Sequence, residues 1–245
     1  MSVRIDGRSP AALRPVQFQA NFQVAPAGAV LVSFGGTRVL CAVSVDKGVP
    51  SWMKAQGATG GWLTAEYRML PGATSPRQGR KENGRSTEIQ RLVGRSLRAV
   101  VDLEKLSELT VTVDCDVLDA DGGTRCAAIT GASVALELAF QKLLREGRIA
   151  QNPLRSQVAA VSVGIVAGQP LLDLSYPEDS AAEVDMNVVM TAEDRLVEVQ
   201  GTGEEATFSR RQMGEMLDLA EAGMRELFAA QRRALQACGC AGAGL

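Results

Sequence analysis

Histidine is absent from this chain of 245 residues. This absence excludes a serine or cysteine nucleophile activated by histidine, because both mechanisms need an imidazole as the general base. It also excludes zinc sites with histidine ligands. Any catalysis must therefore use carboxylates, lysine, arginine, tyrosine, hydroxyl groups or a hard metal ion held by oxygen ligands.

Cysteine is scarce, and the five cysteines offer too few ligands for a metal centre. Cys41, Cys115 and Cys126 lie in apolar segments and are expected to pack as small core residues. Cys238 and Cys240 form a C-x-C pair in a tail of small residues. Reduced thiols in a cytosolic protein are the simplest interpretation.

Long apolar runs are missing as well. The chain contains no stretch of about 18 apolar residues, so we expect no transmembrane helix. The first residues also lack the apolar core of a signal peptide. A cytoplasmic protein without a membrane partner is the resulting expectation.

Positive charge, in contrast, is concentrated in one part of the chain. The segment 68–98 holds eight basic residues and two acidic ones, so it carries +6 and the remainder −8. Seven of the eight basic residues are arginine, which favours phosphate recognition over a solvated helix face with internal ion pairs. We therefore expect a polyanion to bind at one locus.

Hydrophobic periodicity predicts an α/β protein. Alternating apolar residues predict strands over 16–45 (with a turn at the Gly35-Gly36 pair), 109–117, 158–166, 171–176, 182–190 and 196–200, and helical spacing predicts helices over 86–101, 124–145 and 210–232. Segments 47–61 and 70–84 are expected to be loops. Ser86 or Thr87 is expected to cap the first helix, and Ser209 with Gln212 to form a capping box for the last. We expect one domain over 1–235 and a disordered tail over 236–245.

The Gly122-Gly123 pair is the most informative feature of the chain. It is expected to link a strand directly to a helix whose first turn contains Arg125. A helix N-terminus leaves backbone N–H groups unpaired, the glycines let an anion approach them, and a guanidinium grips phosphate oxygens. Arg85 lies just before another predicted helix and marks a second anion-friendly helix start. The pair predicts that the protein binds phosphate, either free or in a nucleic-acid backbone.

A group of acidic residues lies in the last third of the chain. It comprises Asp173, Glu178, Asp179, Glu183 and Asp185. Strand alternation places Glu183, Asp185 and Asn187 on one face, and Asp179 lies in the turn before them. Carboxylates near a phosphate site commonly hold Mg²⁺, which shares its oxygen ligands with substrate phosphates. A solvated acidic turn is the alternative, and the two anion-binding helix starts favour the metal site.

From Arg8 to about Gln231 the sequence resembles the ribonuclease PH family of phosphate-dependent exoribonucleases. The resemblance rests on seven motifs in order: GWLTAEY (61–67), MLP (69–71), GRSTEIQRL (84–92), DADGGTR (119–125), EDSA (178–181), VDMN (184–187) and EVQGT (198–202). It implies the α/β (α+β) fold named after domain 2 of ribosomal protein S5, with mixed sheets packed against helices.

The resemblance also implies roles for individual residues. Phosphate would be bound by Arg85, Gly123, Thr124 and Arg125, while Asp179 and Asp185 are the candidates for acid–base catalysis and for binding Mg²⁺ or Mn²⁺. RNA would be bound by Arg68, Arg77, Arg80, Lys81 and Arg91. The loop after the MLP motif departs from the family pattern, since it is short and has Gly72 where a basic residue is common.

The implied reaction is phosphorolysis of RNA from its 3′ end, chiefly of transfer-RNA precursors, with release of nucleoside diphosphates. The family implies a homo-oligomer, a hexameric ring built as a trimer of dimers. One alternative is a catalytic subunit of an exosome-like ring, and another is a non-catalytic ring subunit that only binds RNA. The retained arginines and aspartates disfavour the second alternative. A simple mononucleotide-binding protein would leave the basic segment 68–98 unexplained.

Overall fold

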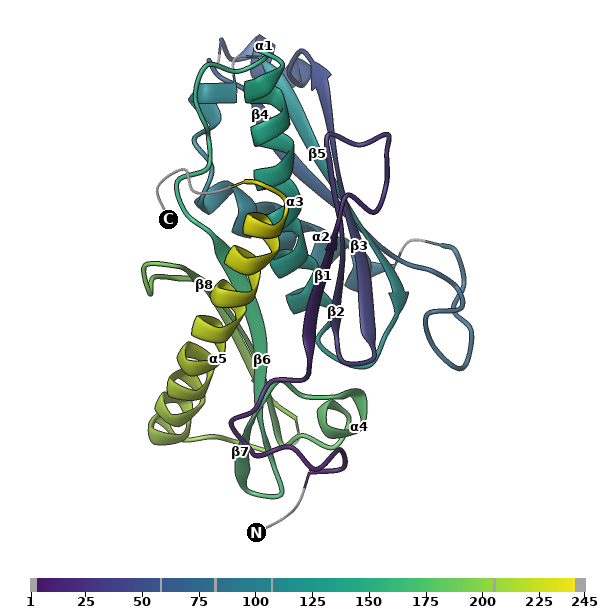
Figure 1. The fold of residues 1–245 in the computed structure, drawn as a ribbon. Helices are drawn as coiled ribbons and strands as arrows, with labels where there is room; N and C mark the ends of the chain where they lie inside the picture. Colours follow the sequence, from purple (N-terminus) through teal and green to yellow (C-terminus); the bar gives the residue numbers. More distant parts are fainter. Residues whose placement is uncertain (1–3, 58, 82, 107, 205, 241–245) are drawn as a thin grey trace.

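The computed structural model describes residues 4–57, 59–81, 83–106, 108–204 and 206–240. Two sheets enclose a long central helix, α3, which runs through the middle of the view in Figure 1. The elements are β1 (Val16–Ala20), β2 (Gly28–Phe34), β3 (Thr37–Lys47), α1 (Ser51–Ala55), β4 (Trp62–Met69), α2 (Gly84–Ala99), a 3₁₀ turn (Leu103–Leu106), β5 (Leu109–Asp119), α3 (Thr124–Arg145), β6 (Val158–Val166), β7 (Gln169–Leu172), α4 (Tyr176–Asp179), β8 (Val184–Thr191), β9 (Leu196–Gly203) and α5 (Arg210–Ala237).

The first sheet has the strand order β1-β2-β3-β5-β4. All neighbouring strands are antiparallel except β4 and β5, which are parallel. In β5, residues alternate between buried and partly exposed, and the strand packs against α3, while its neighbour β4 packs against α2. Parallel strands end at the same edge, so β4 and β5 deliver their carboxyl ends side by side. That edge is where the phosphate site lies.

The second sheet has the order β7-β6-β8-β9, and all its pairs are antiparallel. Helix α5 covers β6 and β7 from outside, and α3 packs against β6 from the other side. Both sheets therefore share α3 and contribute to one hydrophobic core. Strand β8 carries Asp185 and Asn187 toward the N-terminal end of α3.

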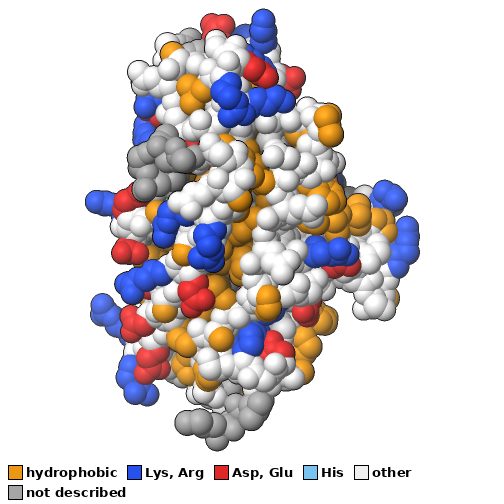
Figure 2. Space-filling view, viewed as in Figure 1, with side chains coloured by type: hydrophobic (Ala, Val, Ile, Leu, Met, Phe, Trp, Pro, Cys, Tyr) orange, Lys and Arg blue, Asp and Glu red, His pale blue; other side chains and the backbone are white. Residues whose placement is uncertain are grey.

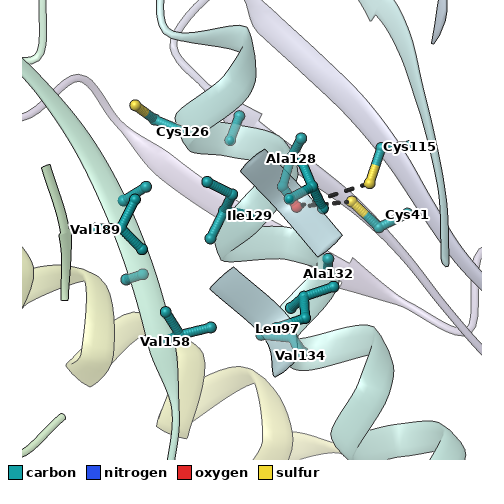
Figure 3. Close-up of a cluster of buried hydrophobic side chains, with 14 of the residues drawn as sticks. Cys41, Leu97, Cys115, Cys126, Ala128, Ile129, Ala132, Val134, Val158 and Val189 are labelled. Atoms are coloured by element: carbon teal, nitrogen blue, oxygen red, sulfur yellow. Dashed lines mark hydrogen bonds between the residues drawn. The ribbon is translucent and has the colours of Figure 1, made fainter. Parts of the chain in front are cut away.

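Helix α3 is buried almost all round because its residues are small or apolar. Figure 3 shows Cys41 and Cys115 pointing at the carbonyl of Ala128, whereas Cys126 points away from them. This helix is long and apolar enough to cross a membrane, although we expected no such helix from the apolar runs of the sequence. In the structure, however, 83% of its most apolar 18-residue stretch is buried inside the protein. Packing between two sheets accounts for its composition.

Several predicted boundaries were wrong. Helix α2 begins at Gly84 rather than at residue 86, and its cap is Asn83, whose side chain accepts a hydrogen bond from the Ser86 N–H at 2.8 Å. The expected loop 47–61 contains the short helix α1, which starts after Pro50. The predicted strand 171–176 ends at residue 172, because Asp173 takes a positive φ of 54°.

The predicted capping box of α5 is confirmed, with Ser209 and Gln212 bonded to each other. The helix runs to Ala237, so the first two residues of the expected disordered tail are helical. A turn follows over 238–239. Residues 241–245 lie outside the described part of the chain.

Gly131 of α3 tests how tightly the helix lies on the first sheet. A Cβ there would lie 2.5 Å from a methyl of Val32 and 2.9 Å from the sulfur of Cys41. Gly131→Ala should therefore lower the free energy of unfolding by about 1–3 kcal/mol, although alanine favours helix. At Gly214 of α5 a Cβ would meet nothing within 4 Å, so Gly214→Ala should raise the free energy of unfolding by up to about 1 kcal/mol. Denaturant unfolding of both variants measures the contrast, and equal effects would contradict this account of the packing.

Candidate phosphate and RNA site

The Gly122-Gly123 turn joins β5 to α3 as the sequence predicts. Both glycines have positive φ, 73° and 63°, a conformation that side chains disfavour. A Cβ on Gly122 would lie 2.6 Å from the carbonyl oxygen of Leu174. Gly123 is the N-cap of α3 and offers no capping side chain, so the first N–H groups of a buried helix remain available to an anion.

A buried ion pair that the sequence analysis missed holds this turn. Arg14 donates to both carboxylate oxygens of Asp173, at 2.7 and 3.0 Å, and also to the carbonyls of Asp121 and Gly122. Thr37 donates to the Gly122 carbonyl at 2.6 Å. Arg14 and Thr37 lie 108 and 85 residues before Gly122 in the chain. No local pattern could have indicated these contacts.

Arg85 stands in the first turn of α2 and lines two neighbouring cavities. The first has a volume of about 460 Å³ and is lined also by Gly122, Gly123, Thr124 and Asp179. The second has a volume of about 530 Å³ and is lined also by Arg125 and Asp185, together with Asn187 and residues 199–202 of β9. The two predicted helix starts thus meet at one place, with the two predicted aspartates beside them.

Two of the phosphate-site side chains are oriented by partners. Tyr67, which is buried, donates to the hydroxyl of Thr124 at 2.8 Å. The hydroxyl hydrogen of Thr124 is therefore left to donate to an oxyanion. Arg125 donates to Gln200 at 3.2 Å and lies 3.6 Å from a carboxylate oxygen of Glu88. Arg125 is thus held between α2 and β9.

The structure divides the acidic group. Asp173 and Glu178 are buried in ion pairs with Arg14 and Arg4. Glu183 is exposed and accepts a hydrogen bond from the Gly168 N–H at 3.0 Å. Asp179, at the end of α4 rather than in a simple turn, and Asp185 on β8 are the two that face the cavities.

The surroundings raise the pKa values of both Asp179 and Asp185. Burial and, to a lesser extent, the negative charge of Asp179 raise the pKa of Asp185, Arg125 and Arg85 oppose them, and the result is a pKa of about 6. Burial also raises the pKa of Asp179, again against Arg85 and Arg125. These mutual influences mean that both arginines and both aspartates act on one another electrostatically across the site.

Oxygen donors for a metal ion are available at Asp179 and Asp185. The Oδ1 atom of Asp185 is buried and has no hydrogen-bond partner among the described residues. Within the same residues no group of three or more histidine, cysteine, aspartate or glutamate side chains is arranged so that it could hold a metal ion. Mg²⁺ commonly uses one or two protein carboxylates and completes its shell with substrate phosphates and water. The donor set fits that kind of ion.

The residues predicted to bind RNA occupy different places. Arg77 lines the first cavity, beside Arg85. Arg80 and Lys81 are exposed on the loop between β4 and α2, which projects at the right of Figure 1 and carries Lys and Arg side chains at its tip in Figure 2. Arg68 lies on β4, close to Asp116, whose pKa is raised by burial and by the charge of Glu66 while Arg68 opposes the rise. Arg91 lines a separate cavity on the flank of α2.

Two family models match the sequence. The model of domain 1 of the 3′ exoribonuclease family matches residues 12–140, and that of domain 2 matches residues 156–223. The ribonuclease PH of Crocosphaera subtropica is 54% identical over 235 residues, which cover 95% of this chain and 97% of that protein. The ribonuclease PH of Corynebacterium efficiens is 56% identical over 237 residues, covering 95% and 96%.

Two solved structures show the same fold. A chain of the Archaeoglobus fulgidus exosome, solved with RNA bound to the active site, has a TM-score of 0.81 and 26% identity, and the match covers 92% of this chain and 91% of that one. Rice Rrp46 has a TM-score of 0.79 and 22% identity over 95% of this chain and all of its own, which shows the fold alone. The predicted fold is confirmed.

Asp185 gives a test of the site's electrostatics. Its pKa in the folded protein, about 6, is above the ordinary value of 3.8, so the folded state holds the proton more tightly than the unfolded chain. The contribution of Asp185 to the free energy of unfolding is therefore complete below about pH 4, where the carboxyl is protonated in both states. It is lost as the pH rises through about 6 and the carboxyl ionises in the folded protein. Asp185→Asn, measured with chelator present, should raise the free energy of unfolding by about 2–3 kcal/mol at pH 8 and by little at pH 4.

The matched control for this measurement is Glu183→Gln, an exposed change two residues earlier, which should alter stability little at either pH. Thermal unfolding at the two pH values is the readout. A gain from Asp185→Asn that is the same at pH 4 and pH 8 would show that the carboxylate is not the source of the effect.

Proposed function

Because the chain belongs to the 3′ exoribonuclease family and is similar over nearly its full length to proteins named ribonuclease PH, we propose that it shortens RNA from the 3′ end by phosphorolysis. Inorganic phosphate is the co-substrate, and nucleoside diphosphates are the products. The observation that carries the proposal is the position of Arg85, which lines both the cavity of the Gly122-Gly123 turn and the cavity of Arg125 and Asp185.

The arginines answer the main physical difficulty of the reaction, which is to bring two anions together. Arg85, Arg125, the Thr124 hydroxyl and the N-terminus of α3 hold the attacking phosphate. Their positive charge offsets its repulsion from the terminal phosphodiester and stabilises the extra charge of the transition state. Tyr67 orients Thr124, and Gln200 and Glu88 hold Arg125, before the substrate arrives, so these two groups need little reorganisation during the reaction.

The chemical step exchanges one P–O bond for another. An oxygen of inorganic phosphate attacks the terminal phosphorus, the bond from that phosphorus to the ribose 3′ oxygen breaks, and the departing oxygen takes up a proton. A carboxyl group with a pKa near the working pH is suited to supply that proton. Asp185, whose pKa is raised to about 6, and Asp179, whose pKa burial also raises, are the two candidates, and whichever of them binds a cation has its pKa lowered and leaves this role to the other.

We further propose that Asp179 and Asp185 can hold Mg²⁺ or Mn²⁺, with the unpartnered Oδ1 of Asp185 as one donor. Such an ion would add positive charge at the phosphate oxygens. Transfer-RNA precursors as substrate, a hexameric ring of this chain and a cytoplasmic location remain predictions. RNA contact by Arg68, Arg77, Arg80, Lys81 and Arg91 also remains a prediction.

An exosome-like subunit is the weaker candidate. The exosome chain of Archaeoglobus fulgidus is 26% identical, against 54% for the ribonuclease PH of Crocosphaera subtropica. A non-catalytic ring subunit is disfavoured because Arg85, Arg125, Asp179 and Asp185 all border the same pair of cavities.

Arg125→Met should lower the rate of phosphate-dependent RNA shortening by about 10²–10³-fold, since it removes one donor to the developing charge. The assay incubates 3′-extended transfer RNA with and without phosphate and identifies the released nucleotide. Diphosphates that form only with phosphate support phosphorolysis, and monophosphates would indicate hydrolysis. Arg211→Met on α5, whose side chain is 84% exposed, is the matched control and should retain full activity.

Removal of divalent metal should also stop the reaction. Chelation is expected to abolish diphosphate release, and added Mg²⁺ should restore it in the unaltered protein. Asp179→Asn and Asp185→Asn should stay inactive at Mg²⁺ concentrations that saturate the unaltered protein, because each removes one of two carboxylates. Full activity in chelator would remove the metal from the proposal, and full activity of either variant would make that aspartate structural.

A further inference from the structure

Both tryptophans of the chain lie together at the start of β4 and at α1, away from the phosphate site. The rings of Trp52 and Trp62 meet edge to face with centroids 5.0 Å apart. Trp52 is 47% exposed, which is unusual for so large an apolar side chain. The guanidinium of Arg98 stacks over Trp62 at 5.0 Å and donates to the carbonyl of Leu63 at 3.0 Å.

A cavity of about 280 Å³ lies between Trp62 and the outer flank of α2. Its lining includes Arg91, Arg95 and Arg98, which follow one another at helical spacing. Gly94 also lines it and has no side chain to fill it. Arg95 pairs with Glu198. No carboxylate pairs with Arg91 or Arg98 within the part of the chain that the structure describes. Burial and the neighbouring charge of Arg95 lower the pKa of Arg98, as expected for a cation without a compensating anion.

We propose that this Trp–Arg cluster, formed by Trp52, Trp62, Arg91, Arg95 and Arg98, is a subsite for single-stranded RNA upstream of the 3′ end that is being shortened. Proteins bind single strands with arginines that follow the phosphates and aromatic rings on which bases stack. The cluster combines both elements, since Trp62 and the three arginines line one cavity and Trp52 lies against Trp62 beside it. The exposed ring of Trp52 provides the stacking surface, and Arg91 and Arg98 provide the phosphate contacts.

The path along α2 sets the length of RNA that reaches the cluster. Arg85 and Arg98 are thirteen residues apart on one helix, which corresponds to about 20 Å at 1.5 Å per residue. A stacked strand advances about 3.4 Å per nucleotide, so about six nucleotides separate the two sites and fewer do so if the strand is extended. A trinucleotide should therefore occupy the phosphate site alone, and an RNA of twelve nucleotides should occupy both.

This inference rests on the proposed exoribonuclease activity, but its first test does not need turnover. Since Trp52 and Trp62 are the only tryptophans, intrinsic fluorescence reports directly on the cluster. The unaltered protein is titrated in phosphate-free buffer, in which phosphorolysis cannot proceed, with a dodecanucleotide and with a trinucleotide. We expect the dodecanucleotide to change the tryptophan emission with saturation and the trinucleotide to leave it unchanged.

The second test compares KM for the two RNAs in Trp52→Leu and Arg91→Gln. Loss of a stacking ring or a phosphate contact should raise KM for the dodecanucleotide about 5- to 50-fold, with kcat retained. KM for the trinucleotide should change less than twofold. Arg211→Gln on α5 removes an equal charge elsewhere and should leave both KM values unchanged.

The outcomes separate the two proposals. A fluorescence change without diphosphate release would support the subsite and overturn the proposed function. Normal diphosphate release with no fluorescence change, or with equal KM changes for both RNAs, would overturn the subsite. Variants that alter the size of the assembly but not KM for the long RNA would identify the cluster as a contact between subunits and overturn the subsite as well.

Discussion

The site depends on the buried pair of Arg14 and Asp173. It connects the segment before β1, the Gly122-Gly123 turn and the end of β7, three parts of the chain that are remote in sequence. Removing one partner of a buried pair typically costs about 3–5 kcal/mol, because the other charge is left uncompensated. The loss would fall on the turn that presents the N-terminus of α3. The pair therefore fixes the anion site in place although neither residue lines the cavities.

Electrostatic balance then shapes what the site can do. Four charged side chains, Arg85, Arg125, Asp179 and Asp185, influence one another across a partly buried space. Without a bound anion the arginines do not fully compensate the carboxylates, as the raised pKa of Asp185 shows. Such a site favours a proton or a cation at Asp185, because either removes the uncompensated negative charge. The ionised carboxyl group of Asp185 therefore lowers the free energy of unfolding at neutral pH.

Helix α2 links this site to its surroundings. Its first turn holds Arg85, and its outer flank carries Arg91, Arg95 and Arg98 toward the two tryptophans. The basic segment noticed in the sequence is thus neither one patch nor a solvated helix face. The structure divides it among the phosphate site, the exposed loop before α2 and the Trp–Arg cluster. One helix accounts for the relation between the first and the last of these.

The sequence by itself determined the three long helices, most of the strands, the Gly-Gly turn and the anion-friendly helix starts, because periodicity, capping and glycine conformation depend on neighbours a few residues apart. It did not indicate α1, α4 or β4. It also led to Arg85, Arg125, Asp179 and Asp185 through the family motifs. Only the tertiary structure decided which acids are free, since the partners of Asp173 and Glu178 lie 159 and 174 residues away. It likewise decided that Tyr67 orients Thr124 and that Trp62 lies between Trp52 and the flank of α2, because such pairings follow from how the sheets and α3 pack and leave no trace in local spacing.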